Sequence, residues 1–281
     1  MKLMNRRIQI HEGFYLALGG AVSVALLVFG SWKPASLIVA ALIAAYALVL
    51  QKTARGSVTR VLAAYVVTWA FYMGSSVIVD WLPSSLRQYT LHQIDALLFN
   101  RLVAKMVEGA FTSWQNDLLS AGYMSYHVYL HWVLIDSLRR GSMWREALGE
   151  RLFLAFGFGF VGYLFFPAAP PLTAFPGLQP DAIAGGFLTR ANEWLNAHMA
   201  ARYDAFPSLH ALVTATLLSW DWRHARWRFR IMLLPSLLML AATLALRLHY
   251  VADLLASAAL FLILSLLHAN RLIDRRASLG A

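Results

Sequence analysis

The hydrophobic positions of this chain run in long continuous stretches, not in the short alternating pattern of half-buried strands. Each stretch approaches the roughly 20 apolar residues that a helix needs to cross the hydrocarbon core of a bilayer. The pattern predicts eight such helices, near residues 13–31, 35–51, 59–82, 116–138, 148–166, 209–222, 230–247 and 249–268. We therefore expect an all-α polytopic membrane protein in which residues 1–281 form a single integral membrane domain.

The composition is also typical of an integral membrane protein. Hydrophobic residues make up 59% of it and charged residues 14%, with a mean hydropathy of +0.57, whereas a soluble domain is about one quarter charged. The chain has no cysteine. Disulfides, thiolate catalysis and cysteine-based metal sites are therefore excluded.

The net charge of +10 raises the alternative of a nucleic-acid partner. The basic residues, however, are scattered in short loops between the apolar stretches and form no basic face. If the N-terminus is cytoplasmic, 17 of the 24 lysine and arginine residues fall on the cytoplasmic side, which is the positive-inside pattern. We predict two cytoplasmic termini and lipid rather than nucleic-acid partners, and the compact loops favour a bacterial inner membrane.

Two long segments then lie on the outer side. Within residues 83–115, the stretch 91–99 has helical spacing and is expected to lie along the membrane interface. Residues 167–207 are rich in proline and glycine near their start, which favours irregular chain. Apolar positions from Phe187 to Met199 predict a short helix that caps a cavity.

The candidate catalytic residues lie where the predicted helices meet this outer side. His210 opens the sixth helix after Ser208, a residue type that favours a helix start, and the free N–H groups of a helix N-terminus are a ready anion site. His249 and Asp253 lie four residues apart at the start of the eighth helix, so we expect both on one face. The carboxylate can hold the imidazole proton and fix its tautomer. With Arg247 nearby, these groups suit displacement at phosphorus, in which one histidine attacks and the other protonates the departing oxygen.

The residues around these histidines resemble a known family. Pro207 to His210 read P-S-L-H and His249 to Asp253 read H-Y-V-A-D. They are similar to the second and third motifs of the type 2 phosphatidic acid phosphatase superfamily, P-S-G-H and S-R-x5-H-x3-D. The resemblance covers about residues 90–268 and implies a catalytic core of that type. It also implies that His249 forms a phosphohistidine, that Asp253 orients it, and that His210 is the general acid.

The departures from the family pattern are specific. Leu209 replaces the glycine of P-S-G-H, Ala242 and Thr243 stand where serine and arginine are expected, and no K-x6-R-P motif occurs. This combination resembles the branch that contains inositol phosphorylceramide synthases and sphingomyelin synthases. Similar features of that branch are found at residues 95–99, 123–126 and 166–171 and at Arg247.

Four further residues are candidates for substrate binding. Arg247 matches phosphate oxygens, and Ser208 stands at the helix start. Asp95 belongs to a family-like segment, with loop capping as the alternative. His127 pairs with His131 at helical spacing, for which helix–helix hydrogen bonding is the leading interpretation, cavity lining the second and a metal half-site the weakest.

The sequence thus predicts a lipid phosphotransferase or phosphatase at the outer leaflet that needs no metal or other cofactor. Its partners would be phospholipids or lipid phosphates, with a lipid alcohol as a possible acceptor. The alternatives are a non-catalytic membrane protein that binds lipids or anions, and a transporter. A transporter is disfavoured because no pair of broken mid-span helices is visible.

Overall fold

A computed structural model describes residues 8–101, 103–175 and 183–279, with side chains described as far as residue 268. The described residues form helices and no named strand; one isolated bridge joins Ala168 to Asp204. The helices are α1 (Ile10–Phe29), α2 (Pro34–Lys52), α3 (Val58–Trp81), α4 (Gln88–Phe99), α5 (Val103–Met106), α6 (Ser113–Leu138), α7 (Ser142–Phe165), α8 (Pro171–Ala174), α9 (Phe187–Met199), α10 (Leu209–His224), α11 (Arg226–Ala245) and α12 (Val251–Leu279).

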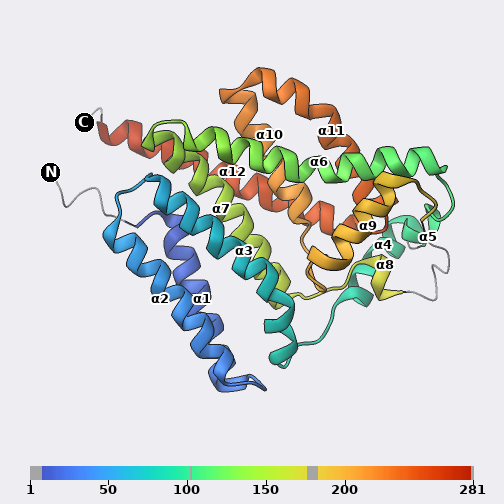
Figure 1. The fold of residues 1–281 in the computed structure, drawn as a ribbon, viewed down its shortest axis with the longest axis horizontal. Coiled ribbons are helices and arrows are strands. Elements are labelled where there is room, and N and C mark those ends of the chain that lie inside the picture. Colours follow the sequence, from blue (N-terminus) through green and yellow to red (C-terminus); the bar gives the residue numbers. More distant parts are fainter. Residues whose placement is uncertain (1–7, 102, 176–182, 280–281) are drawn as a thin grey trace.

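Short polar signals set several of the helix starts. Ser57 and Ser208 accept the N–H groups of Arg60 and Ala211 and so cap α3 and α10, and Thr112 forms a capping box at α6. Such caps satisfy backbone donors that have no partner within the helix. The short helices α4, α5, α8 and α9 gather at one end of the molecule, opposite the C-terminal end of α12 (Figure 1).

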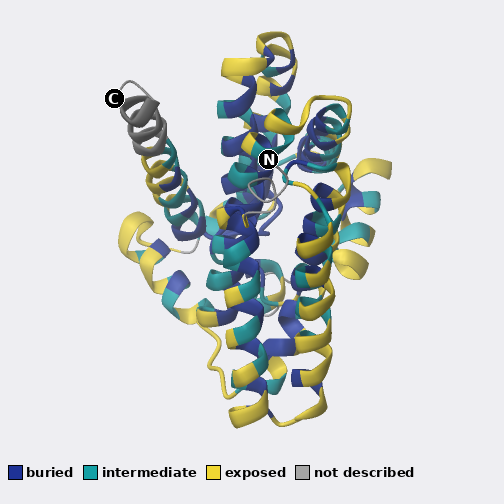
Figure 2. Cartoon of the chain, turned by 90° about the vertical axis from the view of Figure 1, so that its left-hand side faces the viewer, coloured by how far each residue is buried: buried dark blue, intermediate teal, exposed yellow. Residues whose placement is uncertain are grey.

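Six helices in the described residues are long and apolar enough to cross a membrane. They are α1, α2, α3, α7, α11 and the part of α12 from Val251 to His268. Large apolar side chains on these helices face outward, for example Leu37, Leu62 and Leu262, and exposed positions follow the outer sides of the helices (Figure 2). This is the pattern of helices whose surroundings are lipid.

The other two predicted spans, α6 and α10, correspond to helices that do not meet those criteria. α10 has 16 residues, about 24 Å at a rise of 1.5 Å per residue. α6 has 26 residues but carries many polar side chains. Both pack within the bundle, α6 against α11 and α9 and α10 against α7, α11 and α12. A helix in the interior of a membrane protein can carry polar residues. The structure thus shows six helices that are apolar enough to cross a membrane, and the predicted number of eight spans is not confirmed.

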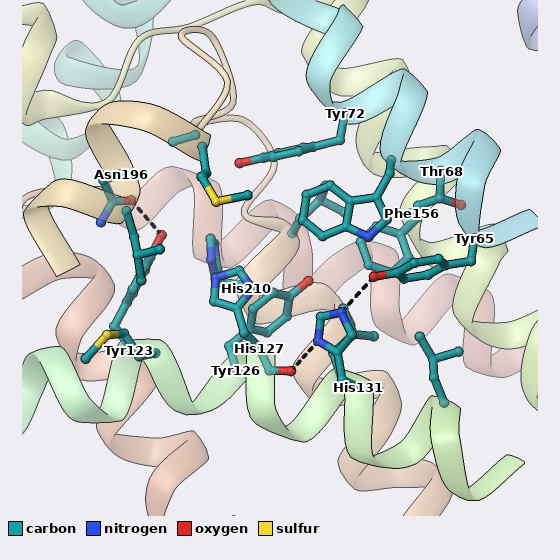
Figure 3. Close-up of a pocket in the computed structure, with 18 of the residues that line it drawn as sticks. Tyr65, Thr68, Tyr72, Tyr123, Tyr126, His127, His131, Phe156, Asn196 and His210 are labelled. Atoms are coloured by element: carbon teal, nitrogen blue, oxygen red, sulfur yellow. Dashed lines mark hydrogen bonds between the residues drawn. The ribbon is translucent and has the colours of Figure 1, made fainter. Parts of the chain in front are cut away.

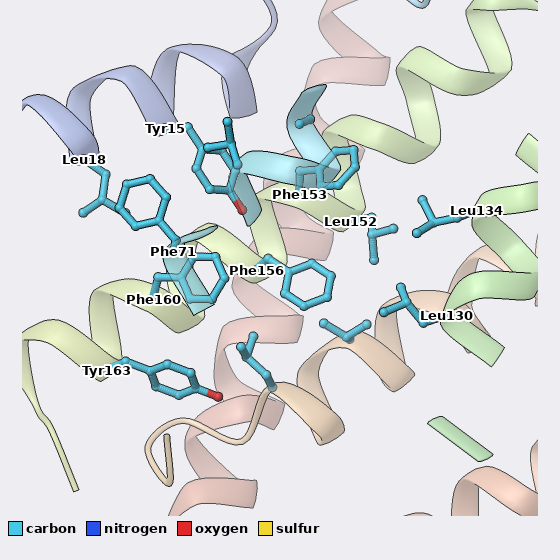
Figure 4. Packing of buried hydrophobic residues seen from close by; sticks show 14 of the residues in the cluster. Tyr15, Leu18, Phe71, Leu130, Leu134, Leu152, Phe153, Phe156, Phe160 and Tyr163 are labelled. Atoms are coloured by element: carbon cyan, nitrogen blue, oxygen red, sulfur yellow. The ribbon is translucent and has the colours of Figure 1, made fainter. Parts of the chain in front are cut away.

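The main apolar core extends from the N-terminal helices and α7 to α6, α10 and α11. Phe71 of α3 stacks on Phe160 of α7 with ring centroids 6.0 Å apart, and Tyr15 of α1 meets the edge of Phe160 at 6.3 Å. The hydroxyl of Tyr15 forms a hydrogen bond with Thr68 Oγ1 at 2.9 Å. These rings hold α1, α3 and α7 together (Figure 4), and burial of each aromatic side chain contributes a large share of the packing energy.

The short helices expected at residues 91–99 and 187–199 are present as α4 and α9. Several of the predicted boundaries are wrong. α7 begins six residues earlier than expected, at Ser142, and α11 begins four residues earlier, at Arg226, and runs through Pro235 to Ala245. α12 starts at Val251 rather than at residue 249 and runs to Leu279 rather than to residue 268. Gly177 and Pro180 of the irregular segment, and the basic residues at both chain ends, lie outside the part of the chain whose side chains are described.

Candidate active site

His249 lies in the turn between α11 and α12. The turn is closed by the carbonyl of Thr243, which accepts the N–H groups of Leu248 and His249, both at 2.9 Å. Arg247 adopts a left-handed conformation with φ of 61°. His249 is 5% exposed. Its Nδ1 lies 2.9 Å from the carbonyl oxygen of Ala205 and 3.3 Å from Asp253 Oδ2.

Both neighbours of Nδ1 are hydrogen-bond acceptors, and this fixes the tautomer. Nδ1 must carry the proton and donate it, so in neutral His249 the lone pair lies on Nε2. The sequence-based expectation that Asp253 holds the imidazole proton agrees with this geometry.

The expectation that His249 belongs to the last helix is wrong. The N–H of Tyr250 donates to Asp253 Oδ2 at 2.7 Å, which is half of a capping box with Tyr250 as the N-cap residue of α12. Because the same carboxylate caps the helix and receives the histidine proton, His249 stays outside the helix and still meets Asp253.

His210 stands in the first turn of α10, beside the His249 ring. The two ring centroids are 5.8 Å apart. Tyr123 and Tyr126 of α6 each place a ring 4.5 Å from the ring centre of His210. His127 approaches the same ring at 6.2 Å. The structure therefore brings together the two histidines and the aspartate that the sequence singled out.

Ser208 caps the start of α10 and bonds to α12 through its backbone, and it does not line the cavity. Its hydroxyl accepts the N–H of Ala211 at 3.3 Å, and its own N–H lies 3.4 Å from the carbonyl of Asp253. Ser257 donates to the Ser208 carbonyl at 2.9 Å. Two N–H groups at this helix start are thus used inside the protein, and the bonds of Ser208 to Asp253 and Ser257 tie α10 to α12.

Two glycines of α7 make room for the segment that carries His210. A Cβ at Gly159 would meet Leu209 Cδ2 at 2.3 Å, and one at Gly162 would meet Pro207 Cδ at 2.1 Å. Side chains at these two positions would collide with that segment. The leucine that replaces the glycine of P-S-G-H is therefore accommodated by a glycine on the facing helix.

Asp95 of α4 binds the N-terminus of α12. Its two carboxylate oxygens accept the N–H groups of Val251 and Ala252, each at 3.1 Å. Burial raises the pKa of the Asp95 carboxyl, and the two backbone donors oppose that shift. Asp95 is fully buried and is not part of the cavity wall, so it positions the start of α12 and matches the capping alternative.

The family-like residues 166–171 join the two motif segments. Ala205 N–H donates to the Ala168 carbonyl at 3.1 Å, and Leu172 N–H donates to the Arg247 carbonyl at 2.9 Å. Tyr250 adds a hydrogen bond from its hydroxyl to the Ala169 carbonyl at 3.2 Å. Arg247 itself is buried, with 4% of its surface exposed, two residues before His249.

A cavity of about 390 Å³ opens beside His210, and mostly apolar and aromatic side chains line it. His127, His131 and Tyr123 contribute from α6, Tyr65 and Tyr72 from α3, and Asn192 and Asn196 from α9 (Figure 3). The expected cap of the cavity by residues 187–199 is therefore confirmed. The volume lies within the range of about 300–1,000 Å³ typical of small-molecule sites.

The pair His127 and His131 lines this cavity and also links helices. His131 Nδ1 lies 2.7 Å from the His127 carbonyl, and its Nε2 lies 2.7 Å from the hydroxyl of Tyr65 on α3. The leading interpretation, helix–helix hydrogen bonding, is confirmed for His131. In the described part of the chain no group of three or more His, Cys, Asp or Glu side chains is arranged to hold a metal ion.

Sequence reasoning missed Asp204 and Tyr72. Tyr72 donates its hydroxyl proton to Asp204 Oδ2 at 2.9 Å, and Asp204 directly precedes the residue whose carbonyl holds His249. Burial raises the pKa of the Asp204 carboxyl, while the charge of His249 opposes the shift. An aspartate inside an irregular segment gave no sign of this contact, because its partner lies 132 residues away.

Comparison with known proteins gives one family. A family model described as the PAP2 superfamily matches residues 91–267, more than half of the chain. No curated protein and no solved structure matches. The matched region contains the cavity-lining residues of α6, α7, α9 and α10 and all of the residues that surround His249.

Proposed function

Because the chain belongs to the PAP2 superfamily, whose members are generally phosphatases or phosphotransferases, we propose that it cleaves or transfers a phosphate ester of a lipid. The reaction runs through a covalent intermediate on His249. The observation that carries this proposal is the hydrogen bonding of His249 Nδ1 to the Ala205 carbonyl and to Asp253. It leaves the Nε2 lone pair as the nucleophile.

In the first step, Nε2 of His249 attacks phosphorus while the bond from phosphorus to the leaving oxygen breaks. The protonated ring of His210 gives its proton to that oxygen. The imidazolium character that develops on His249 is stabilised by Asp253, whose carboxylate faces Nδ1. Phosphorus is then bonded to Nε2, and His210 is neutral.

In the second step, water or an alcohol attacks phosphorus and the bond from phosphorus to Nε2 breaks. His210 takes the proton of the attacking oxygen and so returns to its starting state. Arg247 contributes positive charge for the phosphoryl oxygens. Two histidines and one arginine supply the acid, the nucleophile and the charge stabilisation, so the proposed reaction needs no metal.

The site belongs on the outer side of the membrane. With α6 and α10 crossing the membrane as interior helices, the chain has eight spans, both termini face the cytoplasm, and the basic loops follow the positive-inside pattern. The substrate would then enter from the outer leaflet, and a bacterial inner membrane is the expected location. The departures at Leu209, Ala242 and Thr243 support the branch of head-group transferases over that of simple phosphatases.

The test is a product survey by mass spectrometry. The purified protein is incubated with phosphatidic acid, polyprenyl phosphate, phosphatidylglycerol phosphate and phosphatidylinositol, each with and without diacylglycerol or ceramide. Free phosphate or a released head group identifies a hydrolase, and a new head-group-bearing lipid identifies a transferase. His249→Ala is expected to abolish either product. A protein that binds these lipids but forms no His249-dependent product would be a binding protein or transporter, contrary to the proposal.

A further inference from the structure

The ring of His249 is oriented by a carbonyl group in the irregular segment between α9 and α10. The carbonyl oxygen of Ala205 lies 2.9 Å from Nδ1 of His249, whereas Asp253 Oδ2 lies 3.3 Å from it. The carbonyl is thus the closer of the two acceptors. Residues 201–208 form turns and bends rather than a helix, so no regular hydrogen-bond ladder fixes the direction of this carbonyl. The orientation of the His249 ring therefore depends on the contacts that hold this segment.

The segment is held on two sides. On one side, the N–H of Ala205 donates to the carbonyl of Ala168 at 3.1 Å, and the isolated bridge joins Ala168 to Asp204. On the other side lies α3, where Ser76 Oγ accepts the N–H of Arg202 at 2.7 Å. These two residues are 126 positions apart in the sequence. A helix from the N-terminal part of the chain thus anchors the backbone that leads to His249.

Tyr72 of α3 makes the contact closest to the Ala205 carbonyl. Its hydroxyl donates to Asp204 Oδ2 at 2.9 Å and accepts the N–H of Ala201 at 3.4 Å. One side chain therefore ties together the start of the segment and the residue directly before Ala205. The ring of Tyr72 lines the cavity (Figure 3), but its hydroxyl already donates and accepts within the protein. We infer the role of this hydroxyl from these internal bonds.

We propose that Tyr72 and Ser76 are positioning residues for His249. They fix residues 201–205 so that the Ala205 carbonyl faces Nδ1, which keeps the lone pair of the neutral ring on Nε2. The catalytic consequence of this positioning rests on the function proposed above. α3 lies before residues 91–267, which match the family model, so this support comes from outside the region that identifies the family. Neither side chain takes part in the bond changes at phosphorus.

The first test observes the His249 ring without any substrate. The purified full-length protein is labelled with nitrogen-15 in its histidines, and the ring nitrogen chemical shifts distinguish a protonated from an unprotonated nitrogen. The signals of His249 are those missing from His249→Ala protein. At a pH where the ring is neutral, the wild type should carry the proton on Nδ1. Tyr72→Phe should shift part of the population to the Nε2–H tautomer, and Ser76→Ala should shift a smaller part.

The second test compares Tyr72→Phe with Tyr15→Phe. Tyr15 is a matched control, because its buried hydroxyl also bonds to α3, at 2.9 Å from Thr68 Oγ1, but holds α1 rather than residues 201–205. Both variants should lower the unfolding temperature, and only Tyr72→Phe should lower kcat per folded molecule. The expected loss is about tenfold at unchanged KM, because Asp253 still faces Nδ1 and limits the displacement of the ring. The rates are measured with whichever lipid of the panel above shows His249-dependent turnover.

A third comparison separates position from charge, because the charges of Asp204 and His249 also act on each other. Asp204→Asn keeps an oxygen that accepts the Tyr72 proton and should retain most of kcat, whereas Asp204→Ala should lose as much as Tyr72→Phe. An equal loss in Asp204→Asn and Asp204→Ala would assign the effect to charge and overturn this inference.

Two further results would also overturn the positioning role. They are wild-type His249 signals in Tyr72→Phe protein and a loss of kcat in Tyr15→Phe equal to that in Tyr72→Phe. The proposed function can fail separately. If no lipid gives a His249-dependent product but Tyr72→Phe still shifts the tautomer, the proposed function is wrong and the positioning of His249 by α3 stands.

Discussion

The buried carboxylates at the two ends of α10 have different partners. At the C-terminal end, Asp221 accepts Nε and Nη2 of Arg228, both at 2.7 Å, and the hydroxyl of Tyr129 at 2.8 Å. At the N-terminal end, Asp253 receives the Tyr250 N–H and faces His249, and Asp204 receives the Tyr72 hydroxyl. The first end contains an arginine pair, and the second contains carboxylates held by amide, hydroxyl and imidazole groups.

This difference distinguishes charged groups that stabilise the fold from charged groups that act on the reacting histidine. The bidentate pair of Arg228 with Asp221 satisfies both groups and links α11 to α10. Arg60 and Glu12 likewise form a buried ion pair between α3 and α1, in which Nη1 contacts both carboxylate oxygens. A carboxylate held by neutral donors has no arginine partner, so it can act on the neighbouring imidazole. Near His210 that neighbour is the imidazole of His249, whose proton and orientation the carboxylate controls.

The largest effect is expected for His210→Ala, which removes the proposed acid. The rate should fall about 10²- to 10⁴-fold for substrates with a poor leaving group. The loss should be much smaller for a p-nitrophenyl phosphate ester, whose leaving group departs without a proton. Because His210 also acts as the base of the second step, the check is the single-turnover rate of leaving-group release, which reports the first step alone, for both substrate types in wild-type and variant protein. An equal loss for both would mean that His210 does not protonate the leaving oxygen.

Arg228→Met changes the ion pair at the C-terminal end of α10 and should lower stability without changing activity. It leaves Asp221 buried without its cationic partner, and breaking such a pair costs about 3–5 kcal/mol. Thermal unfolding in detergent should show the loss, while kcat per folded molecule stays within about twofold. The double variant Arg228→Met with Asp221→Leu should regain much of the stability. A selective loss of kcat in either protein would break the proposed division between the two ends.

A smaller effect is expected for Asp95→Asn, which weakens the cap at the start of α12. The change should lower stability by about 1 kcal/mol, as the loss of a helix cap does, and reduce kcat by displacing Asp253 from His249. Unfolding and steady-state rates measured on the same preparation separate the two effects. Asp117→Asn weakens a different cap, at the N-terminus of α9, and serves as the control for a loss of stability without a change at His249.

The smallest expected effect is a pH dependence of protein stability that is due to Asp204. Since burial raises the pKa of this carboxyl in the folded protein, the folded state holds the proton more tightly than the unfolded chain, whose pKa is near 3.9. Stability due to Asp204 should therefore fall as the pH rises from about 4 through the folded pKa. The unfolding temperature of the wild type relative to Asp204→Asn should decrease over that range. A constant difference between them would mean that the carboxyl titrates alike in both states.

The residues with strong local signals could be predicted from the sequence. Ser208 as a helix start, α4, α9 and the meeting of His210, His249 and Asp253 all follow from spacing or from the order of the helices. What failed depended on contacts between distant segments. Asp253 caps its own helix and so excludes His249 from it, and the link between Tyr72 and Asp204 has no local pattern. The pairing of Leu209 with Gly159 likewise becomes evident only when α7 and α10 are packed.

The predicted number of membrane spans also exceeds what hydropathy can establish. Hydropathy identifies a helix that faces lipid, as it does for six helices here. α10 is mostly covered by its neighbours, whereas α6 exposes apolar side chains such as Val128 and Ile135 on one side and turns polar residues toward the cavity and the ion pairs of the interior. A hydrophobic pattern alone cannot distinguish such an interior helix from a helix outside the membrane.

The most direct test of the central claim is to trap the covalent intermediate. The purified protein is mixed with the active phospholipid and quenched within one turnover at alkaline pH, where phosphohistidine survives. Peptide mass spectrometry then locates any added phosphoryl or phosphorylated head group. A covalent mechanism on His249 predicts the adduct on this residue and its absence in His249→Ala protein. Measurable turnover with no adduct, or with an adduct on another residue, would contradict it.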